Sequence, residues 1–177
     1  MSDSPTTMYD IPPSSVILRF GMQTPYWSLT LSYGVFGDPA TRMHFASVDH
    51  WLGYHQLVKR EDRERLMKTP NGFLAHATLQ RILEESGGPE DVIVPTWEND
   101  RDAILDEGLR LKYTQSTFLT DMLVRTRDRQ IVDDSRHTEL YMCFAGGRGA
   151  NAHGKALMRL RRQLIAGTLP LNGVRTA

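Results

Sequence analysis

The chain has 177 residues and carries 21 Lys and Arg against 21 Asp and Glu, so its formal net charge is zero. A globular chain of this length buries roughly 70% of its unfolded surface and needs no covalent staple. Its one cysteine, Cys143, excludes a disulfide framework and a cysteine-based zinc cage. Neutrality also argues against a surface coated with positive charge for nucleic acid.

The charges are unevenly distributed along the chain. No Asp or Glu follows Glu139, whereas six basic residues do: Arg148, Lys155, Arg159, Arg161, Arg162 and Arg175. The first 139 residues therefore carry a formal −6 and the tail +6. Such asymmetry indicates that the C-terminal segment meets an anion. The alternative is a helix whose basic face pairs with acids elsewhere in the fold.

The N-terminal half predicts a flexible arm, two strands and two helices. Residues 1–15 are rich in Ser, Thr and Pro, and they lack the basic and apolar regions of a signal peptide. We expect strands over 16–20 and 29–36, which could pair with each other. Ser47 is a typical N-cap for a helix reaching about Leu57, and a second helix is expected over 73–85.

The C-terminal half predicts three more helices and two short strands. A helix begins after Trp97 and buries Tyr113, and another over 117–125 buries Phe118, Met122 and Leu123. Strands are expected over 130–132 and 139–144, and the last helix over 151–165. The pattern indicates a helix-rich α+β fold with a few short strands. We expect one domain over 16–166, followed by a tail over 167–177. No apolar run is long enough for a membrane span, so we expect a soluble, cytoplasmic protein without membrane partners.

The segment Gly149–Lys155 fits the phosphate-binding pattern G-x-x-x-x-G-K. Ala156 stands where a magnesium-ligating hydroxyl is needed, and the chain before the loop is not of the βαβ type, so an NTPase is disfavoured. A glycine-rich loop that enters a helix can still offer free backbone N–H groups to a phosphate. The alternative is a tight turn that merely starts the last helix.

The other candidate chemistry rests on carboxylates. The six histidines do not show metal-ligand spacing, and Cys143 lies in an apolar run, so we expect no metal, no cofactor and no cysteine nucleophile. Asp49, Asp133 and Glu139 lie near the ends of predicted elements. Paired carboxylates hydrolyse glycosidic bonds: one stabilises the sugar cation, and the other activates water or protonates the leaving group. Asp49 could instead only cap its helix.

Several segments resemble motifs of the NADAR family, also called YbiA-like N-glycosidases. Residues 46–51 resemble its T/S-x-E-H-Y/W helix start, and residues 112–115 resemble K-F-x-Q. Residues 123–126 resemble L-L-x-T, and residues 131–133 resemble L-V-E. The most specific match is residues 149–161 with G-x-N-x-L-G-x-x-L-M-x-x-R. The resemblance covers about residues 20–165 and indicates a divergent member of the family.

The resemblance implies a helix-rich single domain that hydrolyses N-glycosidic bonds. The family's substrates are ribosylaminopyrimidines and ADP-ribosylated guanine bases, so the implied partners are small ribosylated molecules or ADP-ribosylated nucleic acid. Asp49 and Asp133 take the places of catalytic glutamates, and Glu139 that of an aspartate. The residues expected to bind substrate or its phosphates are His50, Trp51, Trp97, Lys112, Tyr141, Arg148, Gly149 and Asn151.

The sequence also departs from the family's motifs. Asp49 and Asp133 are one methylene shorter than glutamate, and an asparagine expected near Leu29 is missing. A carboxylate withdrawn by about 1 Å can cost on the order of a hundredfold in rate. The leading hypothesis is therefore an N-glycosidase. The alternatives are a weakened member that binds ADP-ribose or a nucleotide as a sensor, and a purely structural protein.

Overall fold

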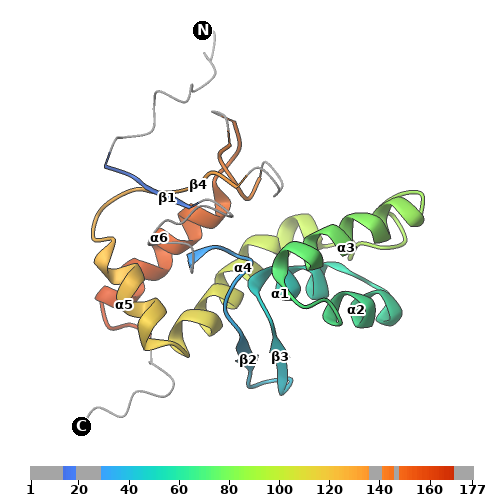
Figure 1. Ribbon diagram of the computed structural model, residues 1–177, viewed down its shortest axis with the longest axis horizontal. Helices are drawn as coiled ribbons and strands as arrows, with labels where there is room; N and C mark the ends of the chain where they lie inside the picture. Colours follow the sequence, from blue (N-terminus) through green and yellow to red (C-terminus); the bar gives the residue numbers. More distant parts are fainter. Residues whose placement is uncertain (1–13, 19–28, 136–140, 146–147, 170–177) are drawn as a thin grey trace, which may run out of the picture. The chain divides into compact units, whose positions relative to one another are not determined.

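The computed structural model describes residues 14–18, 29–135, 141–145 and 148–169. Its chain divides into two compact units. Unit 2 is the continuous segment Leu31–Gln115, and unit 1 joins Met1–Thr30 to Ser116–Ala177. Figure 1 shows the elements along the chain, most of them helices, so the predicted helix-rich α+β class is confirmed.

Unit 2 contains one hairpin and four helices. Strands β2 (Phe36–Asp38) and β3 (Met43–Phe45) pair antiparallel, with Phe36 opposite Phe45. The helices are α1 (Val48–Gln56), α2 (Arg60–Met67), α3 (Gly72–Glu85) and α4 (Trp97–Thr114). Helix α1 contacts both α3 and α4 and is therefore the central helix of the unit.

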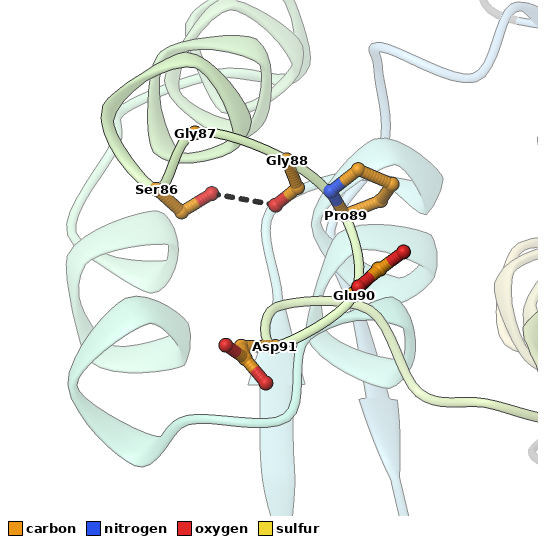
Figure 2. A pocket seen from close by; sticks show the side chains of 6 residues that line it. All are labelled: Ser86, Gly87, Gly88, Pro89, Glu90 and Asp91. Atoms are coloured by element: carbon orange, nitrogen blue, oxygen red, sulfur yellow. Dashed lines mark hydrogen bonds between the residues drawn. The ribbon is translucent and has the colours of Figure 1, made fainter.

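Local sequence signals explain where these helices begin. The Ser47 hydroxyl accepts a hydrogen bond from the His50 N–H and caps α1, as predicted. The Asn71 side chain caps α3 by accepting from the Leu74 N–H at 2.9 Å. Helix α3 ends at the predicted turn, where the Ser86 hydroxyl donates to the Gly88 carbonyl at 2.8 Å (Figure 2). Glu90 and Asp91 complete the recess at this turn, and the charged side chains of its lining are both acidic.

The core of unit 2 has an aliphatic part and an aromatic part. The aliphatic residues come from α2, α3 and the segments that follow α1 and α3, and they are Leu57, Leu66, Ala75, Leu79, Ile82 and Val92. The aromatic part stacks Phe36 on Phe45, with Trp51 edge-on to Phe45 at 5.0 Å between ring centroids. We did not predict α2 from its charged sequence. It forms because Leu66 buries its side chain in the aliphatic cluster.

Unit 1 contains a two-stranded parallel sheet and two helices. Strand β1 (Val16–Leu18) pairs with β4 (Ile131–Asp133), with Val16 opposite Ile131. Helices α5 (Thr117–Arg125) and α6 (Ala152–Ile165) contact each other, and α6 also packs on β4 (Figure 1). Leu119, Leu123, Leu157 and Leu160 are the buried leucines of these two helices.

Three predictions were wrong in detail. The strands expected over 16–20 and 29–36 do not pair with each other: β1 pairs with β4, and residues 29–35 form no strand, since β2 begins only at Phe36 and pairs with β3. Phe118 is 60% exposed, because α5 turns Leu119 and Leu123 inward instead. Residues 141–144 do not form a strand, since their carbonyl groups accept hydrogen bonds from the start of α6. Residues 139–140 of that expected strand lie outside the described residues. The expected boundaries at residues 16, 166 and 167 stay predictions.

Candidate active site

Asp49, the first predicted catalytic residue, lies in the first turn of α1 in unit 2. Its half-buried carboxylate accepts a hydrogen bond from the Ser32 hydroxyl at 2.6 Å. Gly72, the first residue of α3, packs directly against both groups. A Cβ atom at Gly72 would clash with the Asp49 carboxylate and the Ser32 backbone, so this approach requires glycine. Three segments of unit 2 therefore converge on one carboxylate.

Lys112 adds a cation to the same cluster. It lies in the last turn of α4 and is only 1% exposed. Burial lowers the pKa of its amine from 10.5 to about 7, and the charge of Asp49 opposes that fall. At neutral pH the amine can therefore both hold and release a proton. We call Ser32, Asp49 and Lys112 the carboxylate–lysine cluster. We expected Lys112 to contact substrate or its phosphates, and the structure shows its side chain fully buried.

His50, expected to bind substrate, has both ring nitrogens engaged within unit 2. Its Nδ1 lies 2.8 Å from the Ser47 hydroxyl, and its Nε2 lies 3.0 Å from the Thr69 carbonyl oxygen. Because a carbonyl only accepts, Nε2 carries the proton and Nδ1 accepts from Ser47. Burial lowers the pKa of His50 and favours this neutral form. His50 thus ties the start of α1 to the segment that follows α2.

The two tryptophans that we expected to stack on a base are core residues of unit 2. Trp51 is 5% exposed, and its indole N–H donates to the Ile104 carbonyl at 2.8 Å. The ring lies so close to Gly108 of α4 that a Cβ there would clash with it. Trp97 is also buried, at the start of α4. This packing favours a structural role for both rings.

Asp133, the second predicted catalytic residue, ends β4 in unit 1 and is fully buried. Its Oδ2 lies 2.7 Å from Nδ1 of His153, and its Oδ1 accepts from the Ser135 N–H at 2.9 Å. Burial alone would raise the pKa of Asp133, but the bonds to His153 and Ser135 outweigh it and hold the pKa below its ordinary value. The carboxylate is thus ionised and held on both oxygens. Nε2 of His153 is buried without a hydrogen-bond partner among the described residues.

Asn151, expected to bind substrate, completes β4. Its side-chain oxygen accepts from the Asp133 N–H at 3.0 Å, and its amide donates to the Ile131 carbonyl at 2.9 Å. These two bonds imitate the pairing of a neighbouring strand. Asn151 adopts a left-handed conformation with φ 54°, which asparagine tolerates better than most residues. Both polar atoms of its side chain are therefore used within unit 1.

The N–H groups that we expected to be free for a phosphate at the start of α6 are occupied. The backbone N–H groups of Asn151, Ala152 and His153 donate to the carbonyls of Cys143, Tyr141 and Met142. The expectation of a phosphate cradle at these three groups was therefore wrong. The preceding loop folds back on the helix end and satisfies the donors before a ligand can.

The remaining predicted residues of unit 1 are less constrained. Tyr141 is half-buried, and Arg148 and Gly149 are exposed. Gly149 has φ 116°, a conformation that favours glycine. Glu139, the third predicted carboxylate, lies outside the described residues, as do Gly146 and Gly147. The roles of these residues stay predictions.

The site contains residues that the sequence did not single out. Ser32 and Gly72 carried no local signal, because each acts only through a distant segment that packs on Asp49. His153 could have been noticed as a polar residue on the buried face of the last helix, where its ring contacts the Asp133 carboxylate. Within the described ranges, no three His, Cys, Asp or Glu side chains gather as a metal ion would require. None of the helices in those ranges combines the length and apolar character of a membrane span.

The sequence model of the NADAR domain matches residues 21–165. Because the match covers most of the chain, this protein belongs to the NADAR family. It is 22% identical over 145 residues to the N-glycosidase YbiA of Shigella flexneri, an alignment that covers 78% of this chain and 86% of that protein.

A second relative is the chloroplastic riboflavin biosynthesis protein PYRR of maize, 25% identical over 132 residues. That alignment covers 70% of this chain but only 20% of the maize protein, so the chain spans about a fifth of it. Among solved structures, the NMR structure of E. coli YbiA matches with a TM-score of 0.71 and 17% identity. The match covers 97% of this chain and 96% of that one, and it shows a shared fold.

Proposed function

We propose that this protein is an N-glycosidase that hydrolyses the bond between a ribose and a base in a ribosylated or ADP-ribosylated substrate. Membership of the NADAR family and the relative named N-glycosidase support the reaction class. The observation that carries the proposal is the carboxylate–lysine cluster, because it holds a fixed carboxylate beside a lysine that titrates near neutrality. Candidate substrates are ADP-ribosylated guanine and ribosylaminopyrimidines, and the proposed location is the cytoplasm.

Asp49 would stabilise the sugar in this reaction. Cleavage of an N-glycosidic bond leaves a cation-like ribose carbon, which a nearby carboxylate stabilises electrostatically. The hydrogen bond from Ser32 fixes the orientation of Asp49. Because Gly72 has no side chain, it leaves room for the Asp49 carboxylate in this position. Fixed orientation matters because a charge must already point at the reacting carbon when the transition state forms.

Lys112 would serve the leaving base. As the bond breaks, its electron pair moves to the base nitrogen, which must gain a proton. An amine with a pKa of about 7 is protonated in roughly half of the molecules at pH 7, so it can donate that proton and recover it from the attacking water. The second carboxylate function stays assigned to Asp133 or Glu139. The buried, doubly bonded state of Asp133 makes it a weak base.

The test offers the protein ADP-ribosylated guanine DNA and ribosylaminopyrimidines separately and measures released sugar by mass spectrometry. We expect Asp49→Asn to lower the rate at least about a hundredfold. Asp100→Asn is the matched control, because Asp100 is an exposed aspartate in the first turn of α4. Asp133→Asn and Glu139→Gln in the same assay identify the second carboxylate. Equal release by wild type and Asp49→Asn would contradict the assignment. Binding of ADP-ribose without any release would favour the sensor alternative.

A further inference from the structure

A recess of about 620 Å³ in unit 1 is lined mainly by arginines. Arg125 ends α5, Arg127 and Asp128 belong to the following turn, and Arg129 precedes β4. We call these four residues the arginine recess. Its lining therefore combines three arginines with one aspartate, within five residues of the chain. Arg125 stands at the unspecified position of the L-L-x-T motif, and no step of the proposed reaction involves this recess.

The turn that forms the recess is anchored from behind. Arg161 of α6 is 5% exposed, and its guanidinium donates to the Thr126 hydroxyl at 2.7 Å and to the Arg129 carbonyl at 2.9 Å. The side chain of Arg129 donates from Nε to the Thr126 carbonyl at 3.1 Å. These bonds hold the turn in one conformation, although Arg127 has the unfavourable φ of 54°. A bound ligand would thus meet a preorganised surface.

The exposed arginines of the recess differ in their partners from three arginines of unit 2. In unit 2, Arg60, Arg65 and Arg110 each pair with a glutamate within 2.7 Å. In the described part of the chain, neither Arg125 nor Arg127 takes part in an ion pair, although both are exposed. Unit 1 as a whole carries 11 Lys and Arg against 7 Asp and Glu, a formal +4. With three arginines and one aspartate, the recess carries a net positive charge.

The chemistry of the recess selects its partner. A guanidinium group is a planar fork of donors that matches two oxygens of one phosphate, and the recess contains arginine but no lysine. The formal +4 of unit 1 favours a polyanion over a single small anion. We propose that the arginine recess binds the phosphate backbone of a nucleic acid. It would then anchor a polymer that carries the modified base. The anchoring role rests on the proposed function, whereas the binding does not.

Binding is tested by fluorescence anisotropy with a labelled 15-nucleotide single-stranded DNA at several salt concentrations. Arg125→Gln/Arg127→Gln should raise Kd about tenfold or more at low salt. It should also reduce the slope of log K against log salt by about 1.4, since each lost contact to a single strand removes about 0.7. The matched control is Lys68→Gln/Arg81→Gln, which removes two exposed charges from unit 2 and should leave Kd within about threefold. Both variants change exposed side chains, and circular dichroism checks that they fold.

Two further measurements sharpen the result. Arg125→Lys/Arg127→Lys keeps the charge and should retain most of the salt slope while losing affinity, because lysine cannot form the bidentate contact. Poly-glutamate should compete much less well than unlabelled DNA. The proposal is overturned if wild type binds no DNA, if both double variants to Gln weaken binding equally, or if poly-glutamate competes as well as DNA.

The outcome is separable from that of the proposed function. Arg125→Gln/Arg127→Gln should release sugar from a mononucleotide-sized substrate at the wild-type rate, because the recess is not part of the carboxylate–lysine cluster. Binding through the recess by a wild-type protein that releases no sugar would contradict the proposed function and leave the binding site in place. If wild type released sugar but Arg125→Gln/Arg127→Gln bound DNA as tightly as wild type, the proposed binding site would be contradicted and the proposed function would stand.

Discussion

Lys112 is fully buried, and its charge is balanced only in part. Burial lowers its pKa to about 7, and the attraction of Asp49 does not restore the ordinary value of 10.5. This fall corresponds to about 4 kcal/mol of unfavourable folding free energy at pH 7. Such a cost persists where a buried amine has a chemical task. The residue therefore links the stability of unit 2 to the proposed reaction.

We predict that Lys112→Met raises stability and abolishes release of sugar. The folded pKa lies below the unfolded one, so unfolding takes up a proton between pH 7 and 10.5, and wild-type stability rises with pH through this window. The advantage of the variant should therefore be greatest at pH 7 and below, at roughly 1–4 kcal/mol, and shrink towards pH 10. Urea denaturation at pH 6, 8 and 10 measures it. An equal advantage at pH 6 and pH 10 would exclude the lowered pKa.

Single residues show what the sequence could and could not predict about the site. Ser47 was predictable as a cap and Asp49 as a first-turn carboxylate, because both signals lie within four residues of each other. The burial of Lys112 was not, since it depends on how α4 packs within its unit. For the same reason Asn151 matched a family motif, yet only the structure shows its amide paired with β4.

At the scale of elements, the junction between α6 and β4 determines the geometry around Asp133. Asn151 closes the free edge of β4, and Gly154 lets the helix approach so closely that a Cβ there would clash with the Ile131 carbonyl. The parallel strand β1 covers the other edge. Strand β4 is thus bonded on both sides, although each strand has only three residues. Pairing of this kind depends on contacts about 115 residues apart, which local sequence patterns do not predict.

We predict that Asn151→Ala destabilises this junction. The substitution leaves a buried N–H and a buried C=O of β4 without partners, at a cost of roughly 2–4 kcal/mol. Arg148→Ala, an exposed change in the preceding loop, should alter stability by less than about 0.5 kcal/mol. Thermal unfolding followed by circular dichroism compares the two. If Asn151→Ala instead keeps wild-type stability and only raises KM, Asn151 binds substrate as the family resemblance implies.

For the whole molecule, the zero net charge conceals two oppositely charged units. Unit 2 carries 10 Lys and Arg against 14 Asp and Glu, a formal −4, which balances the +4 of unit 1. The uneven tail charge was visible in the sequence. The boundary between the units was not, because unit 1 is assembled from both ends of the chain. The arginines of unit 1 differ in their surroundings: Arg161 is buried and anchors a turn, whereas Arg125 and Arg127 are exposed.

We predict that residues 31–115 fold without the rest of the chain. Both ends of this segment are tied to its interior: the Val48 N–H donates to the Leu31 carbonyl, and the Gln115 side chain bonds the backbone N–H and C=O of Gly37 in β2. Ser32, Asp49 and Lys112 all lie within it. The fragment should show a cooperative thermal transition and a helical circular dichroism spectrum. Its Lys112 should still titrate near pH 7 by NMR, because α4 packs on α1 and β2 and the opposing charge of Asp49 lies in the same unit. A folded fragment in which Lys112 titrates near 10.5 would mean that unit 1 supplies that burial, and a fragment without a cooperative transition would mean that the two units fold only together.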